Sequence, residues 1–300
     1  MKNKIPKGTL ARNKEKWAYL FISVPVVFYI CVRFMPTLYA FYLSFTDWDI
    51  ISAKANWIGF DNYKKLFSDD LFYKTLSNTL YYVLYGLPLS LLFGFILAYN
   101  IDKTKIGNGL FKTVYFMPYI TSLVAVAWVW RWLFQPAPIG ILNNILIMLG
   151  FPMQEFLNSV SQSKGCILAA TIWSGVGFQM IIFMAGMKGI SKQYYEAAKI
   201  DGASSFDELK YITIPLLRNS FIFLLITGTI RFLRIFTQVV NMTRNSSGGP
   251  LNSSKPLVLY IYDTAFRSFD MGYASALTVI LFLIILMITM IQMRVTRDEK

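Results

Sequence analysis

Two arginines, Arg231 and Arg234, stand three positions apart in the mostly apolar stretch 219–241. Residues at this spacing share one face of an α-helix, so both side chains are expected to point the same way. A guanidinium group offers a planar pair of donors that matches a carboxylate or a sulfate. Because the stretch contains no Asp or Glu, the pair could bind an anionic group supplied from outside it.

Polar and aromatic neighbours extend this candidate site. Gln238 and Asn241 could hydrogen-bond the hydroxyl groups of a ligand, although hydrogen bonds between helices would explain them equally well. Phe232 and Phe236 could stack on the flat face of a ligand, although packing against lipid or other helices is the commoner role of such aromatics. The six residues are therefore candidates for ligand contact.

Several common chemistries are closed to this chain. It has no histidine, which removes the usual general base, the commonest metal ligand and any Ser-His-Asp arrangement. No glycine is followed directly by lysine, so a G-x-x-x-x-G-K-[ST] phosphate loop is excluded. Cys31 and Cys166 lack the spacing of a metal or redox site and are expected to be packing residues. We predict no catalytic residue, no metal and no cofactor in the chain itself.

Six long apolar stretches indicate membrane-spanning helices. Hydrophobic residues make up 55% of the 300 positions and charged residues 15%, against roughly 25% charged in soluble proteins. Each stretch exceeds the roughly 18 residues that argue for a spanning helix. The sequence predicts an all-α integral membrane protein with a transmembrane domain over 18–293 and tails at 1–17 and 294–300. The predicted spans lie near 18–43, 76–99, 112–134, 166–187, 219–241 and 272–293.

Basic residues fall mainly on one side of these spans. Lys and Arg number 17 in the two tails and the segments 100–112 and 188–218, against 8 in the alternate segments between spans. This positive-inside pattern predicts that both termini and segment 188–218 are cytoplasmic. The net charge of +13 is thus an orientation signal and makes membrane lipid the expected partner. Nucleic acid is not expected, because no basic stretch interleaved with aromatics occurs in a soluble domain.

Charged groups inside the predicted spans are all arginines. All 16 Asp and Glu residues lie outside, so a carboxylate relay for ion coupling is unsupported. Arg131 can snorkel to the interface beside aromatic anchors, and Arg33, in the outer half of its span, could also reach water. Arg231 and Arg234 lie near mid-span, where an isolated cation costs at least about 2.5 kcal/mol. A cavity, a partner chain or a ligand must therefore compensate them.

The segment 189–215 is expected to form two short helices that project into the cytoplasm. Ser191 can cap the first helix, which contains the good helix formers of 196–198. Gly202 supplies a stop, because glycine tolerates the left-handed backbone that ends a helix.

The second short helix has its own boundary signals. Ser205, with Glu208 three residues later, predicts a capping box at its start. Pro215 predicts the break between this helix and the next span. The whole segment is therefore a helix-turn-helix between two predicted spans.

The spacing within this segment resembles a known family motif. Glu196-Ala197-Ala198 is followed by Gly202 after three residues, and Ile212, Ile214 and Pro215 follow nine residues later. This resembles the EAA loop of binding-protein-dependent ABC importer permeases, although that family usually has Leu where Ile214 stands. The resemblance implies that the segment docks on an ATP-hydrolysing subunit; a simple connector is the alternative. The implied coupling residues are Glu196, Ala197, Ala198, Asp201, Gly202, Ile212 and Pro215.

Other segments, in order along the chain, look like the first of the two permeases of carbohydrate importers. These segments are Trp57–Tyr63, Val114–Pro118, Trp130–Phe134, Gly248–Pro250 and Leu257–Tyr262. The resemblance implies a multi-pass protein of a bacterial cell membrane that pairs with a second permease. It also implies two copies of a cytoplasmic ATPase, which would bind ATP and magnesium, and an extracytoplasmic solute-binding protein.

These observations lead to the hypothesis of a permease that forms half of a carbohydrate path. Members of the resembled family usually carry less charge at positions 231 and 234, which leaves three accounts of Arg231 and Arg234. They could pair with acids of the second permease, line a hydrated cavity, or bind an acidic saccharide such as a uronate-containing oligosaccharide.

Two other classes of function compete with this hypothesis. An ion-coupled secondary transporter or channel would work without any ATPase. A membrane-embedded transferase would need paired carboxylates at the membrane surface, whereas the cytoplasmic carboxylates here are explained by helix capping and the coupling motif.

Overall fold

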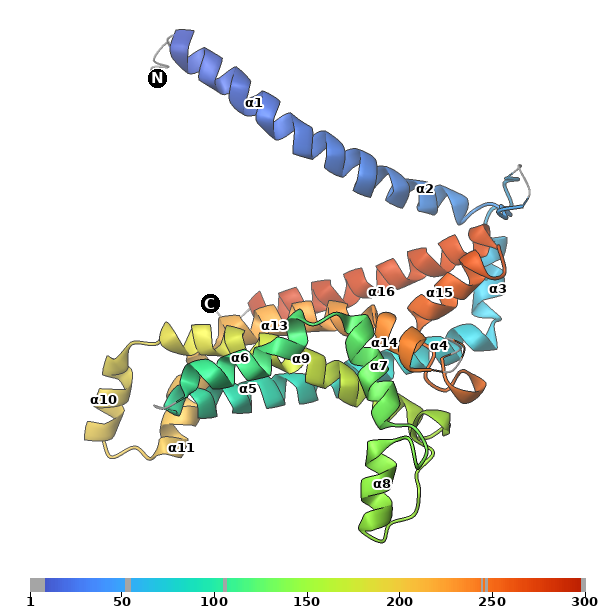
Figure 1. Cartoon of the computed structure of the whole chain (residues 1–300). Helices are drawn as coiled ribbons and strands as arrows, with labels where there is room; N and C mark the ends of the chain where they lie inside the picture. The colour runs from blue at the N-terminus through green and yellow to red at the C-terminus, as the bar shows by residue number, and fades with distance from the viewer. Residues whose placement is uncertain (1–8, 52–54, 105–106, 244, 246–247, 298–300) are drawn as a thin grey trace. The chain divides into compact units, whose positions relative to one another are not determined.

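A computed structural model describes residues 9–51, 55–104, 107–243, 245 and 248–297, without the side chains of 9–13 and 297. The chain divides into two units, Met1–Phe67 with Thr264–Ile280, and Ser68–Asp263 with Leu281–Lys300. Over the described ranges the regular elements are all helical (Figure 1). This confirms the predicted all-α fold class.

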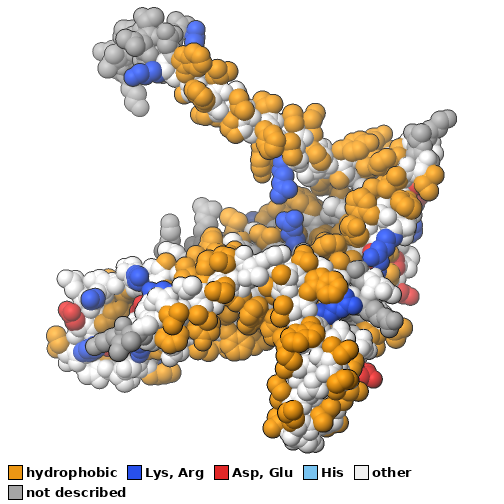
Figure 2. All heavy atoms as spheres, in the orientation of Figure 1, with side chains coloured by type: hydrophobic (Ala, Val, Ile, Leu, Met, Phe, Trp, Pro, Cys, Tyr) orange, Lys and Arg blue, Asp and Glu red, His pale blue; other side chains and the backbone are white. Residues whose placement is uncertain are grey.

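The first unit begins with a long apolar helix. Its parts are α1 (Thr9–Tyr29), a π-helical turn (Ile30–Phe34) that contains Arg33, and α2 (Met35–Leu43). Together they supply a candidate span, Lys14–Leu43, whose most apolar window has no buried residue within the chain. Hydrophobic side chains cover the visible face of α1 and α2 (Figure 2). This surface suits contact with lipid or with another apolar chain.

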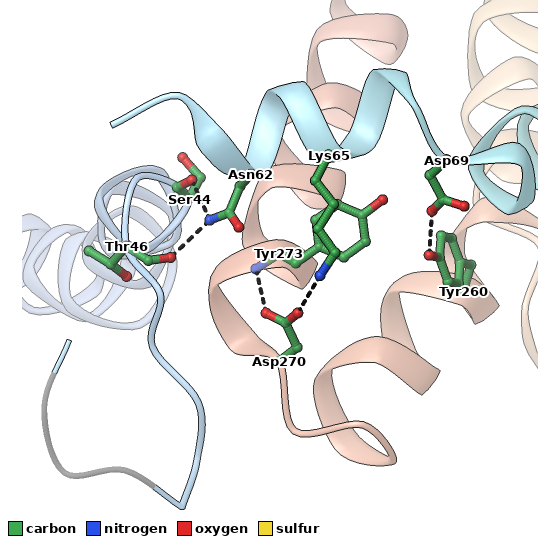
Figure 3. A network of polar contacts seen from close by, with 8 residues as sticks. All are labelled: Ser44, Thr46, Asn62, Lys65, Asp69, Tyr260, Asp270 and Tyr273. Atoms are coloured by element: carbon green, nitrogen blue, oxygen red, sulfur yellow. Dashed lines mark hydrogen bonds and ion pairs between the residues drawn. The ribbon is translucent and has the colours of Figure 1, made fainter. Parts of the chain in front are cut away.

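A polar network ties distant parts of the first unit together (Figure 3). Asn62, on α3 (Asp61–Phe67), donates from Nδ2 to the carbonyl oxygens of Ser44 at 3.0 Å and Thr46 at 2.8 Å. Lys65 forms an ion pair of 2.9 Å with Asp270, whose other carboxylate oxygen accepts from the backbone N–H of Tyr273. The start of α16 (Met271–Arg297) is thereby fastened to α3.

The second unit holds most of the helices, and its ribbon is shown in Figure 1. They are α4 (Asp70–Tyr81), a π-helical turn (Tyr82–Gly86), α5 (Leu87–Lys103), α6 (Asn108–Ile120), α7 (Leu123–Leu133), α8 (Ile141–Met148), α9 (Ser163–Lys188), α10 (Lys192–Ile200), α11 (Ser205–Asp207), a π-helical segment (Glu208–Thr213), α12 (Ile214–Leu216), α13 (Arg218–Leu233), α14 (Thr237–Met242) and the greater part of α15 (Leu257–Phe266).

Four of the six predicted spans are single helical stretches among the described residues, namely Lys14–Leu43, Asp70–Lys103, Ser163–Lys188 and Met271–Thr296. The other two are broken. The predicted span 112–134 consists of α6 and α7, which meet at 96°. Pro118 lies inside α6 and lacks a backbone N–H, and this helix ends at Ile120. The predicted span 219–241 is not one helix either, because α13 ends at Leu233.

Helix α9 forms the centre of the second unit. Two-thirds of its most apolar window is buried, and α5, α6 and α13 pack around it. Its glycines permit close packing of backbones, as is common between membrane helices. At Gly177, a Cβ would overlap the carbonyl oxygen of Tyr115 on α6. The approach of α6 to α9 therefore depends on the absence of a side chain at Gly177.

We expect Gly177→Ala to lower the free energy of unfolding of the full-length protein by about 1–3 kcal/mol, because the added methyl group overpacks the α6–α9 contact. Thermal unfolding of the purified chain in detergent measures this. Gly165→Ala is the matched control on the same helix, since nothing lies within 4 Å of a Cβ there. The control is expected to be neutral or stabilising, because alanine favours a helix over glycine. Equal stability of the two variants would contradict the proposed contact.

Candidate functional site

The segment 189–215 forms the predicted helical hairpin at one end of the second unit, beyond the ends of α9 and α13 (Figure 1). Ser191 caps α10 as expected, since its hydroxyl accepts from the backbone N–H of Gln193. Gly202 ends α10 as expected, with φ of +80°. Nothing lies within 4 Å of a Cβ at Gly202, so the backbone conformation rather than space requires glycine.

The predicted capping box of Ser205 and Glu208 is wrong by one residue. Ser204 is the N-cap of α11, and its hydroxyl accepts from the backbone N–H of Asp207. The Asp207 carboxylate accepts in return from the backbone N–H of Ser204 at 3.0 Å. Adjacent serines followed by adjacent acids permit both registers, and the backbone selects the first because Ser204 is extended.

Hydrogen bonds from Ser204 hold the pKa of Asp207 below its ordinary value. The charged carboxylate therefore stabilises this turn at neutral pH. That contribution is lost as the pH falls through the lowered pKa.

The predicted break at Pro215 occurs later in the structure. The helical backbone continues through a π-helical segment into α12, where Pro215 occupies the first turn and needs no N–H partner. The chain bends by 62° after Leu216. The hydroxyl groups of Tyr195 on α10 and Thr213 lie 3.0 Å apart, which connects the two arms of the hairpin.

Most of the predicted coupling residues lie at the surface of the hairpin. Glu196, Ala197, Asp201, Gly202 and Pro215 are exposed, whereas Ala198 and Ile212 are half-buried. Sequence reasoning missed the large apolar side chains beside them. Ile200 is 86% exposed, and Tyr194 and Phe206 are exposed as well. The sequence does show apolar residues next to a polar turn, and this pattern could have indicated them. Exposed apolar side chains of this kind are typical of a surface that contacts another protein.

The two arginines near mid-span have different surroundings. Arg231, on α13, is half-buried and donates from Nη2 to the hydroxyl of Ser174 at 3.2 Å and to the carbonyl of Thr171 at 3.4 Å. A Cβ at Gly175 would overlap its guanidinium, so the side chain lies directly against α9. Arg234 follows the end of α13, is exposed, and has no ion pair with any described residue. The expected shared helical face is therefore interrupted.

A cavity of about 220 Å³ lies beside Arg231. Its other lining residues are Tyr119, Phe178, Gln179, Leu224, Thr227 and Gly228. The ring of Tyr119 stacks on that of Phe178 at 4.8 Å, and the side-chain oxygen of Gln179 accepts from Ser90 at 2.9 Å. Tyr119 and Gln179 were not predicted as site residues. Aromatic and amide groups with a cation could bind a polar ligand here.

The remaining predicted ligand contacts lie elsewhere. Phe232 is 1% exposed in the hydrophobic core, where its ring packs against Gly86. Gln238 is buried on α14. Phe236 packs against the ring of Tyr262, with centroids 5.3 Å apart. Asn241 donates to the carbonyl of its own helix at Thr237. In this conformation Arg231 is the predicted residue that lines the cavity.

Arg131 lies beside an aromatic ring of its own helix. Its guanidinium lies 4.9 Å from the centre of the Trp128 ring, and it donates to the carbonyl of Asn241 at 3.4 Å. Over the residues that the structure describes, no group of His, Cys, Asp and Glu could hold a metal ion.

The chain matches the family described as "binding-protein-dependent transport system inner membrane component" over residues 72–298. The chain belongs to this family. The predicted resemblance to EAA-loop permeases is thus confirmed, and the hairpin lies inside the matched region. Family membership makes the chain a membrane component of a transport system.

Two relatives cover nearly the whole chain. The protein named "Probable ABC transporter permease protein YesP" of Bacillus subtilis is 32% identical over 95% of this chain and 92% of its own. The lactose transport system permease protein LacF of Rhizobium radiobacter is 30% identical over 98% of each chain.

A solved structure shares the fold. It is a bacterial ABC transporter involved in the import of the acidic polysaccharide alginate. The matched chain has a TM-score of 0.83 and 22% identity, and the match covers 98% of this chain and all of the other.

We expect Ser204→Ala to loosen the start of α11, because loss of an N-cap hydroxyl costs about 1 kcal/mol. Amide hydrogen exchange of residues 205–213 should accelerate about fivefold. Ser205→Ala, one position along and also exposed, is the matched control and should leave exchange unchanged. The opposite ranking of the two variants would restore the register first expected from the sequence.

Proposed function

We propose that this chain is a permease subunit of an ATP-driven importer and forms half of the path of a carbohydrate. The family match over 72–298 carries the assignment to transport, and the sugar named for LacF supports the substrate class. Because the chain has no phosphate loop, ATP and magnesium bind to two copies of a separate ATPase. A second permease completes the path, and an extracytoplasmic binding protein delivers the substrate.

The 189–215 hairpin is the surface on which the ATPase docks. Exposed Glu196, Ala197 and Ile200 offer a mixed polar and apolar contact. A displacement of α10 passes through the Tyr195–Thr213 hydrogen bond to the π-helical segment and then to α13. Helix α13 has sixteen residues, so at 1.5 Å per residue about 24 Å separate its start from its end beside Arg234. Helix α13 thus connects ATP hydrolysis to the substrate path.

The substrate is an acidic saccharide, and Arg234 is the residue that binds its anionic group. Arg231 already has acceptors on α9, whereas Arg234 is exposed and has no carboxylate partner among the described residues. An exposed guanidinium near mid-span requires water, a partner chain or an anion. The likeness in fold to the alginate importer is compatible with a carboxylate ligand.

The coupling role predicts that Gly202→Val uncouples ATP hydrolysis from transport. A β-branched residue is strained at a φ of +80°, so the turn between α10 and α11 should be distorted. Substrate-stimulated ATP hydrolysis and uptake, measured on the complete reconstituted importer, should both fall at least tenfold. Gly202→Asn is the control, because asparagine tolerates this backbone region and should retain most activity. Normal stimulated ATPase activity of Gly202→Val would refute the docking role.

The substrate role predicts a charge-selective defect in Arg234→Gln. Uptake of an oligogalacturonate should fall about tenfold or more, since a hydrogen bond to a charged group contributes about 1.5–3 kcal/mol. Uptake of the fully methyl-esterified, neutral oligomer should change little. Arg231→Gln should impair both substrates equally, because it removes the contact between α13 and α9. Equal losses for both substrates in Arg234→Gln would exclude recognition of an anionic group by Arg234.

A further inference from the structure

The connection between α7 and α9 contains a hairpin, residues 135–154, that is built around α8. Asn143 is fully buried inside it. Its Nδ2 donates to the carbonyls of Gln135 and Gln154, both at 3.0 Å, and its Oδ1 accepts from the backbone N–H of Gln154 at 2.8 Å. The buried amide of Asn143 therefore joins the two ends of the hairpin.

The outside of the same hairpin is apolar. Met148 is 84% exposed, Leu149 67% and Phe151 60%, and Ile147 and Met153 are exposed too. No charged residue occurs between Arg131 and Glu155. Figure 2 shows hydrophobic side chains over most of the visible face of this projection. So many exposed apolar side chains on a charge-free segment are unusual for a loop in water.

Three backbone N–H groups at the hairpin tip have partners within the hairpin. Beyond α8, the N–H groups of Leu149, Gly150 and Phe151 donate to carbonyls of the last turn at 2.9–3.1 Å. Gly150, with φ of +80°, supplies the left-handed residue that this closure needs. Pairing of these donors lowers the cost of placing the turn in hydrocarbon, where water cannot serve as a partner.

The direction of the hairpin also favours a lipid environment. Helix α7 meets α6 at 96°, and α8 continues away from the bundle, across the axes of α5, α6 and α9 (Figure 1). If these axes follow the membrane normal, a crosswise projection runs in the plane of the membrane. It leaves the bundle near the end opposite the 189–215 hairpin (Figure 1). Trp128 and Trp132 on α7 are exposed, as is typical of residues at a membrane interface.

We propose that the 135–154 hairpin is embedded in the lipid leaflet opposite the 189–215 hairpin, as an anchor that does not span the membrane. Its buried amide and exposed aliphatic groups reverse the pattern expected in water, and hydrocarbon chains are the occupant that matches an uncharged apolar surface. The anchor fixes the end of α7 laterally while α13 moves. This role is separate from the identity of the substrate.

Site-directed spin labelling of the full-length chain in proteoliposomes tests this proposal. A nitroxide is attached at Met148→Cys or Leu149→Cys, in a background with Cys31→Ser and Cys166→Ala. Both positions are highly exposed, so the label should not disturb the fold. Collision with oxygen, which concentrates in lipid, should exceed collision with the water-soluble nickel reagent NiEDDA by several-fold.

Asn158→Cys, an exposed position just beyond the hairpin, is the matched control and should show the reverse preference. Collision of the Met148 and Leu149 labels with NiEDDA at the rate of the Asn158 label would overturn the proposal in favour of a water-facing surface. Protection of both labels from both reagents would overturn it in favour of a surface covered by protein.

Discussion

Hydrocarbon offers no hydrogen-bond partner, and this constraint governs where polar groups lie in the chain. Threonines of the spans return their hydroxyl hydrogen bonds to their own helices, as Thr171 does to Ile167 and Thr229 to Leu225. Gln179 pairs with Ser90, and Arg231 uses acceptors on α9. Among the described side chains, exceptions in the spans are the buried Thr289 hydroxyl and the Gln292 carbonyl oxygen on α16. Polar side chains that cannot bond within their own helix therefore need an acceptor or donor on a neighbouring helix.

Small residues and helix breaks determine how closely the helices approach and where the chain turns. Close contact of α9 with α6 and with Arg231 requires glycine at 177 and at 175. The 96° bend between α6 and α7 directs the following segment across the bundle rather than along it. Helix α13 begins after a bend at the 189–215 hairpin and ends beside Arg234, so a single helix connects the hairpin to this arginine.

The two arginines show which features of a site cannot be predicted from residue spacing. Spacing along the chain made Arg231 and Arg234 equivalent, because both lie in an apolar stretch without acids. The structure separates them, because α9 supplies acceptors for Arg231 and α13 ends before Arg234. The aromatic side chain at the cavity is likewise not one of the two that the sequence predicted. Phe232 faces the core and Phe236 packs against Tyr262, whereas Tyr119 of α6 lines the cavity.

The sequence alone determined the membrane class, the six apolar stretches and the helical hairpin, because hydropathy, charge and capping act over short stretches of chain. It also carried the family motif around Glu196 and Gly202. The register of the Ser204–Asp207 capping box, the different surroundings of the two arginines and the buried Asn143 of an apolar hairpin were decided only by the tertiary structure. The capping register depends on the backbone angles of one residue. The other two features depend on which of several chemically similar groups meets a partner distant in the chain. Local periodicity of the sequence encodes neither the angles nor the distant contacts.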